Sequence, residues 1–229
     1  MSIPRRVLLT APAVIVAHDA AAQEVVDMLL VLAMDASGSI GEEEFRLQRE
    51  GYAEALTHPQ VIAAIRSKAR SAMGIAMIEW GSPGGSQTIV DWRRVSDLAS
   101  AQALADALMA APRTQQSYNA IGDAIHHASH LLREGPFRAE QLVIDVSGDG
   151  PDMRSHRPAP VARDIVVRRG MVVNALAIAV AGQVTRGGET LEENYRRDVM
   201  GGPGAFVINA ESRRDIARAL RAKLIREMA

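Results

Sequence analysis

The order of hydrophobic and polar positions along the chain predicts strands that alternate with helices. Residues 28–34 (MLLVLAM) are apolar without interruption, which is typical of a strand buried on both faces of a parallel sheet. Similar apolar runs predict further strands at residues 73–80, 141–146, 172–180 and 205–209. Residues 87–92 follow a glycine-rich connection so closely that we expect them to form an antiparallel hairpin partner of strand 73–80.

The segments between these strands show helical periodicity. Three glutamates at residues 42–44 begin one helix, since acidic side chains suit the positive end of a helix dipole. The other predicted helices span residues 96–110, 120–132, 160–169, 189–200 and 211–228. Strands that alternate with helices of about 10–15 residues predict a doubly wound, Rossmann-like α/β fold. We expect a mostly parallel six-stranded sheet with helices on both faces and one short antiparallel edge strand.

The direction of each strand decides which loops share an edge of the sheet. Parallel strands bring their carboxyl ends together, so the loops after residues 34, 146 and 180 meet at one edge. The antiparallel strand runs towards the opposite edge, and the helix after it runs back. The loop 112–119 therefore lies at the same edge as the other three loops. The glycine cluster 201–204 leads into the last strand from the opposite edge, and we interpret it as a turn.

Three oxygen-rich segments are predicted to meet at this carboxyl edge. They contain Asp35, Ser37 and Ser39 after the first strand, Ser117 and Asn119 before a helix, and Asp149 after the fourth strand. Carboxylate, hydroxyl and amide oxygens are ligands for a hard divalent cation, and we predict Mg²⁺, with Mn²⁺ or Ca²⁺ as alternatives. Neutral hydroxyls leave such a metal electrophilic enough to accept an acidic group from a partner.

Two further acids lie near the same strands. Glu79 ends the second strand close to the carboxyl edge, and we regard it, with Ser117, as a candidate for an auxiliary role at the metal. Asp145 alternates with Ser147 on the fourth strand, and we expect it to be a buried, hydrogen-bonded structural acid rather than a ligand.

Several motifs, in order, resemble those of a known family. DASGS after an apolar strand, NAIGDAI at a helix start and VIDVSGDG are similar to the three metal-site segments of von Willebrand factor A-type domains. More narrowly, VIDVSGDGPD, DASGSIGEEEFRLQREGYAEAL and RRDVMGGPGAFVINA resemble the bacterial family called domain of unknown function 1194, from about Val26 to the C-terminus. The resemblance implies a metal-ion-dependent adhesion site with Ser37 and Ser39 as direct ligands. It also implies that Asp35 and Asp149 act directly or through water.

The second loop departs from the pattern of von Willebrand factor A-type domains. Those domains usually have a threonine three residues before the glycine, and this chain has Asn119 at that position. An amide oxygen is a suitable ligand, but the longer side chain moves it outward, which near-octahedral Mg²⁺ tolerates poorly. Ser117, two residues earlier, is the alternative ligand. We therefore predict a metal site that is weakened or altered by Asn119.

Composition and charge remove other classes of function. The chain has 26 Lys and Arg residues against 27 Asp and Glu residues, and this near-zero balance argues against nucleic-acid binding. It has no cysteine, which excludes disulfides, thiolate zinc sites and cysteine nucleophiles. It also lacks a Walker loop and a G-x-G-x-x-G motif after the first strand, so we expect no nucleotide.

The first residues have the features of a secretory signal peptide. Arg5 and Arg6 precede an apolar stretch at 7–17 and a small-residue cleavage site that ends at Ala22. We therefore predict a signal peptide at residues 1–22 and one domain at residues 23–229. The arginine pair also resembles a twin-arginine export signal, and the sequence leaves the export route open. An N-terminal helix packed on the domain is the alternative. We expect a periplasmic or secreted protein without a membrane span in its mature chain.

Histidines on one predicted helix form a further pattern. His126 and His130 are four residues apart, with Asp123 one turn earlier. A zinc protease helix has this spacing but needs a glutamate after the first histidine, and residue 127 is His127. We interpret these residues as an exposed helical face.

The sequence leaves three hypotheses about function. The first is a non-enzymatic binding module whose divalent cation captures an acidic residue of a protein partner. The second is a metal-assisted hydrolase of phosphoesters or esters that uses Asp35 and Asp149, although we find no general base or nucleophile beside them. The third is a structural domain with a vestigial site.

Overall fold

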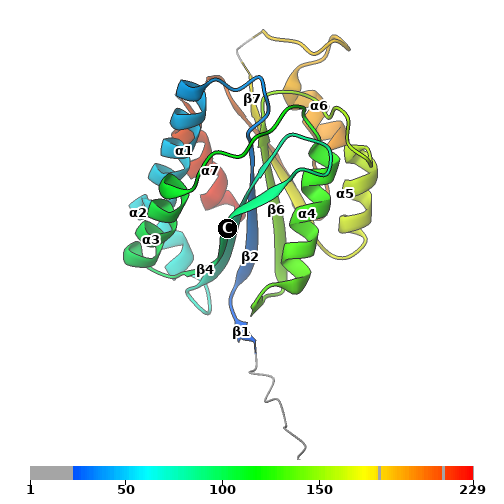
Figure 1. Cartoon of the computed structure of the whole chain (residues 1–229). Coiled ribbons are helices and arrows are strands. Elements are labelled where there is room, and N and C mark those ends of the chain that lie inside the picture. The colour runs from blue at the N-terminus through cyan, green and yellow to red at the C-terminus, as the bar shows by residue number, and fades with distance from the viewer. Residues whose placement is uncertain (1–22, 180–181, 213–214, 229) are drawn as a thin grey trace, which may run out of the picture.

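A computed structural model describes residues 23–179, 182–212 and 215–228, so the predicted signal peptide lies outside the described residues. In the described part of the chain, a central sheet lies between two layers of helices (Figure 1). No helix of this part has both the length and the apolar composition that are needed to cross a membrane.

The main sheet has six strands in the order β4-β3-β2-β6-β7-β8 among the described residues, and β4 is antiparallel to β3 while the other neighbours are parallel. These strands are β2 (Met28–Asp35), β3 (Met73–Trp80), β4 (Gln87–Val95), β6 (Gln141–Gly148), β7 (Val172–Ile178) and β8 (Val207–Ala210). The topology confirms the predicted fold class. β4 is longer than predicted because it continues, through a register shift, along the full length of β3.

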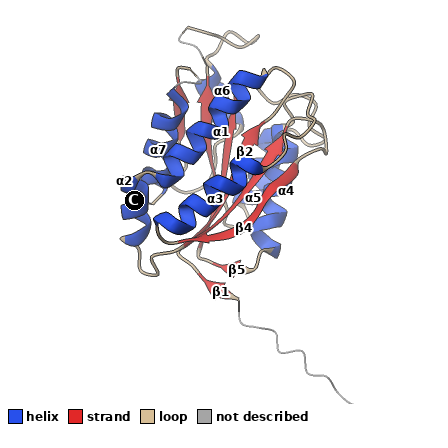
Figure 2. Ribbon diagram, turned by 60° about the vertical axis from the view of Figure 1, so that its left-hand side comes forward, coloured by secondary structure: helices blue, strands red, loops and turns tan. Residues whose placement is uncertain are grey.

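Helices cover both faces of the sheet (Figures 1 and 2). One face carries α1 (Glu42–Thr57), α2 (Pro59–Arg66), α3 (Leu98–Ala110) and α7 (Ile216–Glu227). The other face carries α4 (Ile121–Glu134), α5 (Ala159–Val167) and α6 (Leu191–Asp198).

Three short elements were not predicted. α2 begins directly after α1, where His58 caps the new helix by accepting a hydrogen bond from the Gln60 N–H and Pro59 occupies the first turn. β1 (Glu24–Val25) and β5 (Phe137–Arg138) pair as a separate two-stranded parallel sheet. Strands of two residues have no periodicity in the sequence, because alternation needs several positions to become visible.

The continuous apolar run of β2 serves two hydrophobic cores. Leu29, Val31 and Ala33 pack into the core beneath α4–α6, and the alternate positions Leu30 and Leu32 pack into the core beneath α1, α3 and α7. This confirms the prediction of a strand buried on both faces. It also fixes the end of β2, and therefore Asp35, at the carboxyl edge of the sheet.

The glycine cluster forms a turn at the opposite edge, as predicted. Gly201 exchanges backbone hydrogen bonds with Val173 near the start of β7. Gly202 and Gly204 have φ angles of 99° and 74°, a region that glycine enters without the steric cost of a Cβ atom.

Candidate metal centre

Asp35 and Ser37 form the buried floor of the predicted site. Asp35 is the last residue of β2 and is fully buried, and the backbone N–H of Ser37 donates to its Oδ1 at 2.8 Å. The backbone N–H of Asp149 donates to Asp35 Oδ2 at 3.3 Å. Both carboxylate oxygens are therefore held by backbone groups, which fixes the orientation of the Asp35 side chain.

Ser39 and Asp149 complete the cluster towards solvent. Ser39 Oγ lies 3.1 Å from Ser37 Oγ and 3.3 Å from Asp149 Oδ2. Ser37 is buried, Asp149 is half-buried and Ser39 is exposed. The structure thus brings together the oxygens of all four residues after β2 and β6, in a site that opens at the carboxyl edge.

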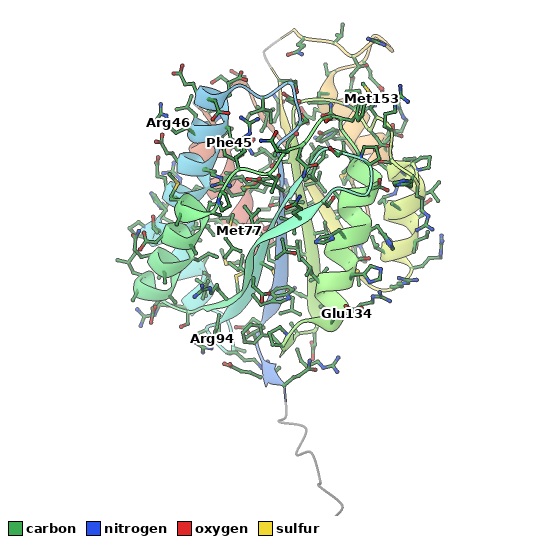
Figure 3. The ribbon with its side chains drawn as sticks, in the orientation of Figure 1. Phe45, Arg46, Met77, Arg94, Glu134 and Met153 are labelled. Carbon is green, nitrogen blue, oxygen red and sulfur yellow. The ribbon has the colours of Figure 1, made fainter. Side chains whose placement is uncertain are left out.

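Asn119, in the loop before α4, lies beside the backbone that follows Asp149. A Cβ atom added to Gly150 would lie 2.4 Å from Asn119 Nδ2, so this amide packs directly against the backbone that follows Asp149. Asn119 Oδ1 is buried and has no hydrogen-bond partner among the described residues. The Asn119 backbone carbonyl accepts from the Met153 N–H at 2.7 Å, and Figure 3 shows Met153 at this end of the molecule.

Ser117 lies beside the segment that carries Asp35, Ser37 and Ser39. Its carbonyl oxygen is 3.2 Å from the position of a Cβ atom on Gly38, between the two site serines. Its backbone N–H donates to Ser82 Oγ at 3.0 Å, and the residue is exposed. Ser117 is therefore near the rim of the cluster, and its role as an auxiliary ligand stays a prediction.

Close backbone packing holds these loops at their positions. A Cβ atom on Gly81 would lie 3.1 Å from Ser37 Cα and 2.9 Å from the Tyr118 carbonyl oxygen, so the loop after β3 supports two of the three segments. On the other side, Tyr195 Oη of α6 donates to the Gly150 carbonyl at 2.9 Å. The loops are thus positioned by contacts that a larger side chain would disrupt.

Glu79 lies behind the cluster, where it holds the second loop. It is fully buried and forms a 2.6 Å ion pair with Arg49 of α1. Its other oxygen accepts from the Thr114 N–H at 2.8 Å. Glu79 therefore anchors the loop that carries Ser117 and Asn119, and any effect on a metal would act through that loop.

Asp145 is buried, as predicted, but its partner is an ammonium group. Lys223 of α7 is fully buried and forms ion pairs with Asp145 and, at 2.9 Å, with Glu227. Burial raises the pKa of Asp145 to about 7, against the opposing effect of Lys223. No sequence pattern indicated this pairing, because Lys223 is remote from Asp145 along the chain.

The residues present fit a divalent cation. Burial, and then the charge of Asp149, raise the pKa of Asp35 to about 7, although hydrogen bonds from Ser37 lower it. No lysine, arginine or histidine forms an ion pair with Asp35 in the part of the chain that the structure describes. A buried carboxylate without a cation is unfavourable. A divalent ion would supply that charge, and Asn119 Oδ1 is an oxygen without another partner among the described residues.

A family model described as "Protein of unknown function (DUF1194)" matches residues 25–229. The chain belongs to this family. No curated protein matches the sequence.

Solved structures show that the DUF1194 chain has the fold of a von Willebrand factor A domain. The pilus adhesin SpaC from Lactobacillus rhamnosus GG has a TM-score of 0.65 at 18% identity, over 90% of this chain and 31% of the adhesin. A von Willebrand factor type A protein from Catenulispora acidiphila has a TM-score of 0.58 at 19% identity, over 89% and 43% of the two chains.

A third similar structure is the proximal thread matrix protein 1 of the mussel byssus. It is described with a zinc-occupied MIDAS (metal-ion-dependent adhesion site) motif. Its TM-score is 0.61 at 15% identity, over 88% of this chain and 46% of the mussel chain. The chain thus spans less than half the length of each of these three proteins.

Proposed function

We propose that this protein is a metal-ion-dependent protein-binding module of the adhesion type. The observation that carries the proposal is the pair of acids Asp35 and Asp149 in one hydroxyl-lined cluster, where Asp35 is fully buried without an ion-pair partner among the described residues. Two of the similar structures, an adhesin and a matrix protein with a zinc-occupied MIDAS motif, support the same interpretation.

Each residue has a distinct part in this proposal. Ser37 and Ser39 would hold the metal through neutral hydroxyls, and Asn119 through its amide oxygen. Asp35 and Asp149 would balance the charge of the ion. The metal would supply an electrophilic position for a carboxylate of the partner, and the exposed side of Ser39 marks where that group would enter. We take Mg²⁺ as the ion, with Mn²⁺ and Ca²⁺ as the other hard cations.

Calorimetry with Mg²⁺ and Mn²⁺ tests the metal site. We expect one bound ion per chain for the wild type and none for Asp35→Ala. Asp106→Asn is the matched control, because Asp106 is an exposed acid on α3, away from the cluster. Equal binding by wild type and Asp35→Ala would exclude the proposed site.

Affinity capture from the producing cell tests the partner. We expect a protein that is retained by the wild type and by Asp106→Asn, and that is released by EDTA and not retained by Asp35→Ala. A protein that is retained equally with EDTA would show that binding does not use the metal.

The hydrolase hypothesis is our second candidate, and a further variant, Asp149→Ala, decides it. Metal-dependent turnover of generic phosphoesters or esters, lost in Asp149→Ala, would replace the binding module with an enzyme. The contacts of the Asp35 carboxylate with backbone N–H groups favour a ligand over a general base, since these groups hold it as an acceptor.

The predicted export is part of the same proposal. A signal peptide at residues 1–22 would place the module in the periplasm or outside the cell, where a binding protein meets surface partners. Protein sequencing of the mature N-terminus tests the prediction, and we expect it to begin at Gln23.

A further inference from the structure

Four of the six histidines in the chain line one pocket on the α4 side of the molecule. The pocket has a volume of about 440 Å³ and is lined by His126, His127 and His130 of α4 and by His156 of the loop before α5. It is separate from the oxygen cluster described above. Figure 3 shows the two ends of this side, with Met153 near the carboxyl edge and Glu134 at the other end of α4.

His126 and His130 have the spacing of a chelating pair. Their rings meet edge to face with centroids 4.6 Å apart. The two residues lie one turn apart on the same face of α4. Two imidazole nitrogens, each ~2 Å from a shared tetrahedral ion, place their ring centres about 5 Å apart. The ring centres therefore lie at a suitable separation, but the edge-to-face arrangement means that at least one ring must rotate before both nitrogens face one ion.

The ring of His156 is already oriented by a carboxylate. Asp123 Oδ2 lies 2.9 Å from His156 Nδ1 and also accepts from the Gly84 N–H at 2.8 Å. Burial alone would raise the pKa of Asp123, but hydrogen bonds from Gly84 and His156 outweigh it and hold that pKa below its usual value. With its Nδ1 held by Asp123, His156 has Nε2 free for a ligand, the arrangement that metal-binding histidines commonly have.

The other charges around the pocket are compatible with a metal ion. His130 Nδ1 lies 3.4 Å from Glu134 Oε1 and 2.9 Å from Arg133 Nη2. The Arg133 guanidinium can only donate, so His130 Nδ1 accepts from it, and an ion at Nε2 requires Arg133 to move so that Nδ1 can carry a proton towards Glu134. Arg157 and Asp123 both line the pocket, so one cationic and one anionic side chain face the same space.

We propose that His126 and His130 chelate a late first-row transition-metal ion, Zn²⁺ or Cu²⁺, with His156 turning in as the third ligand. Among the described residues, no three His, Asp or Glu side chains are already arranged around a common metal position, so a ring of the pair must rotate and His156 must turn with a shift of its contact with Asp123. Imidazole nitrogens favour this class of ion, whereas the hard oxygen ligands of the cluster favour Mg²⁺, Mn²⁺ or Ca²⁺. The protein would thus carry two metal sites of different ligand chemistry.

Calorimetry with Zn²⁺ in the presence of excess Mg²⁺ tests the proposal on the full chain. We expect one Zn²⁺ per chain, at least ~100-fold weaker binding in His126→Gln and His130→Gln, and ~10-fold weaker binding in His156→Gln. Asp35→Asn should leave Zn²⁺ binding unchanged, and His126→Gln should leave Mg²⁺ binding unchanged. The failure of either site is therefore visible separately.

Two histidines serve as matched controls. His127 neighbours the pair on α4 and contacts Thr88 Oγ1, and His58 caps α2 away from the pocket. His127→Gln and His58→Gln should each bind Zn²⁺ like the wild type. Loss of binding in His127→Gln equal to that in His126→Gln would overturn the assigned pair. Zn²⁺ binding that survives His126→Gln but is lost in Asp35→Asn would overturn the second site.

Discussion

Asp35 and Asp145 are two buried acids on neighbouring strands, and among the described residues only Asp145 has a cationic partner. Both are fully buried, and burial raises the pKa of each to about 7. Asp145 is paired with the buried ammonium of Lys223, whereas Asp35 is held by backbone N–H groups and neutral hydroxyls. The comparison shows two solutions to the cost of a buried carboxylate: one cation is part of the chain, and the other would come from solution.

The difference follows from the positions of the two acids. Asp145 lies within β6, beneath α7, where a lysine side chain from the helix reaches it in a closed core. Asp35 lies at the end of β2, where the neighbouring Ser39 is exposed and an ion can enter. The ion pair of Asp145 thus lies in the closed core, and the candidate binding site around Asp35 lies at the open edge of the sheet.

Replacement of Lys223, the cation that pairs with Asp145, should have the largest effect on stability. Lys223→Met leaves Asp145 and Glu227 buried together without a positive charge, and loss of one partner of a buried pair costs about 3–5 kcal/mol. We expect a loss of this size in the free energy of unfolding, measured with urea. Lys68→Met is the matched control, because Lys68 is the other lysine of the chain and is not buried. Equal stability of the two variants would show that Lys223 is not needed by the two acids.

In metal-free protein, the pH dependence of stability should show how strongly the ionised, buried Asp35 carboxylate destabilises the folded state. Its pKa is about 7 in the folded state, against 3.8 for an unperturbed aspartate, so between these values the folded state holds a proton that the unfolded state has lost. Stability therefore falls as pH rises from about 4 to about 7, by on the order of 3 kcal/mol for this residue. We expect Asp35→Asn to flatten this slope in urea unfolding with EDTA.

Asp145 provides the internal comparison for that experiment. Its pKa is also about 7, so part of the slope should remain in Asp35→Asn. Addition of Mg²⁺ should restore the stability of the wild type most strongly above pH 7, where the Asp35 carboxylate is ionised. An unchanged slope in Asp35→Asn would contradict the assignment of the raised pKa to Asp35.

The neutral ligands should affect metal affinity more than stability. Ser37→Ala removes a hydroxyl that would hold the ion, and we expect a decrease of ~10–100-fold in Mg²⁺ affinity, or about 1.4–2.7 kcal/mol. Calorimetry measures the affinity, and Ser67→Ala on the exposed end of α2 is the control. Affinity equal to that of the wild type would remove Ser37 from the site.

Asn119→Thr should have the smallest effect and the opposite sign. A shorter side chain draws the ligand oxygen inward, which suits the strict geometry of Mg²⁺. We expect Mg²⁺ affinity to rise by up to ~10-fold, about 1.4 kcal/mol, in the same calorimetric assay. Weaker binding in Asn119→Thr would show that the amide oxygen is a better ligand here than a hydroxyl.

Much of the fold was predictable because its signals are local. The strand at Met73–Trp80 was predicted with its observed bounds, and the antiparallel direction of its hairpin partner followed from the short connection between them. The segments of the site were predictable for the same reason, since Asp35, Ser37 and Ser39 follow a strand whose end is visible in the sequence. What could not be predicted was which distant side chains fill each environment.

The histidines illustrate this limit. The sequence placed His126 and His130 on one helix but offered no reason to join His156 to them, because that residue belongs to a loop 26 positions further along. Asp123 connects the two, through hydrogen bonds that exist only after α4 and the loop have packed together. Glu79 is similar, since its role in holding Thr114 depends on an ion pair with Arg49.

By itself, the sequence determined the alternation of strands and helices, the edge at which the oxygen-rich loops meet, and the hard-ligand chemistry of Asp35, Ser37 and Ser39. These properties depend on residue type and short spacing. Only the tertiary structure decided that Lys223 neutralises Asp145, that Asp35 has no such partner among the described residues, and that the Asn119 oxygen is buried. The reason is physical: the cost of a buried charge depends on all the groups around it, and folding brings those groups from distant parts of the chain.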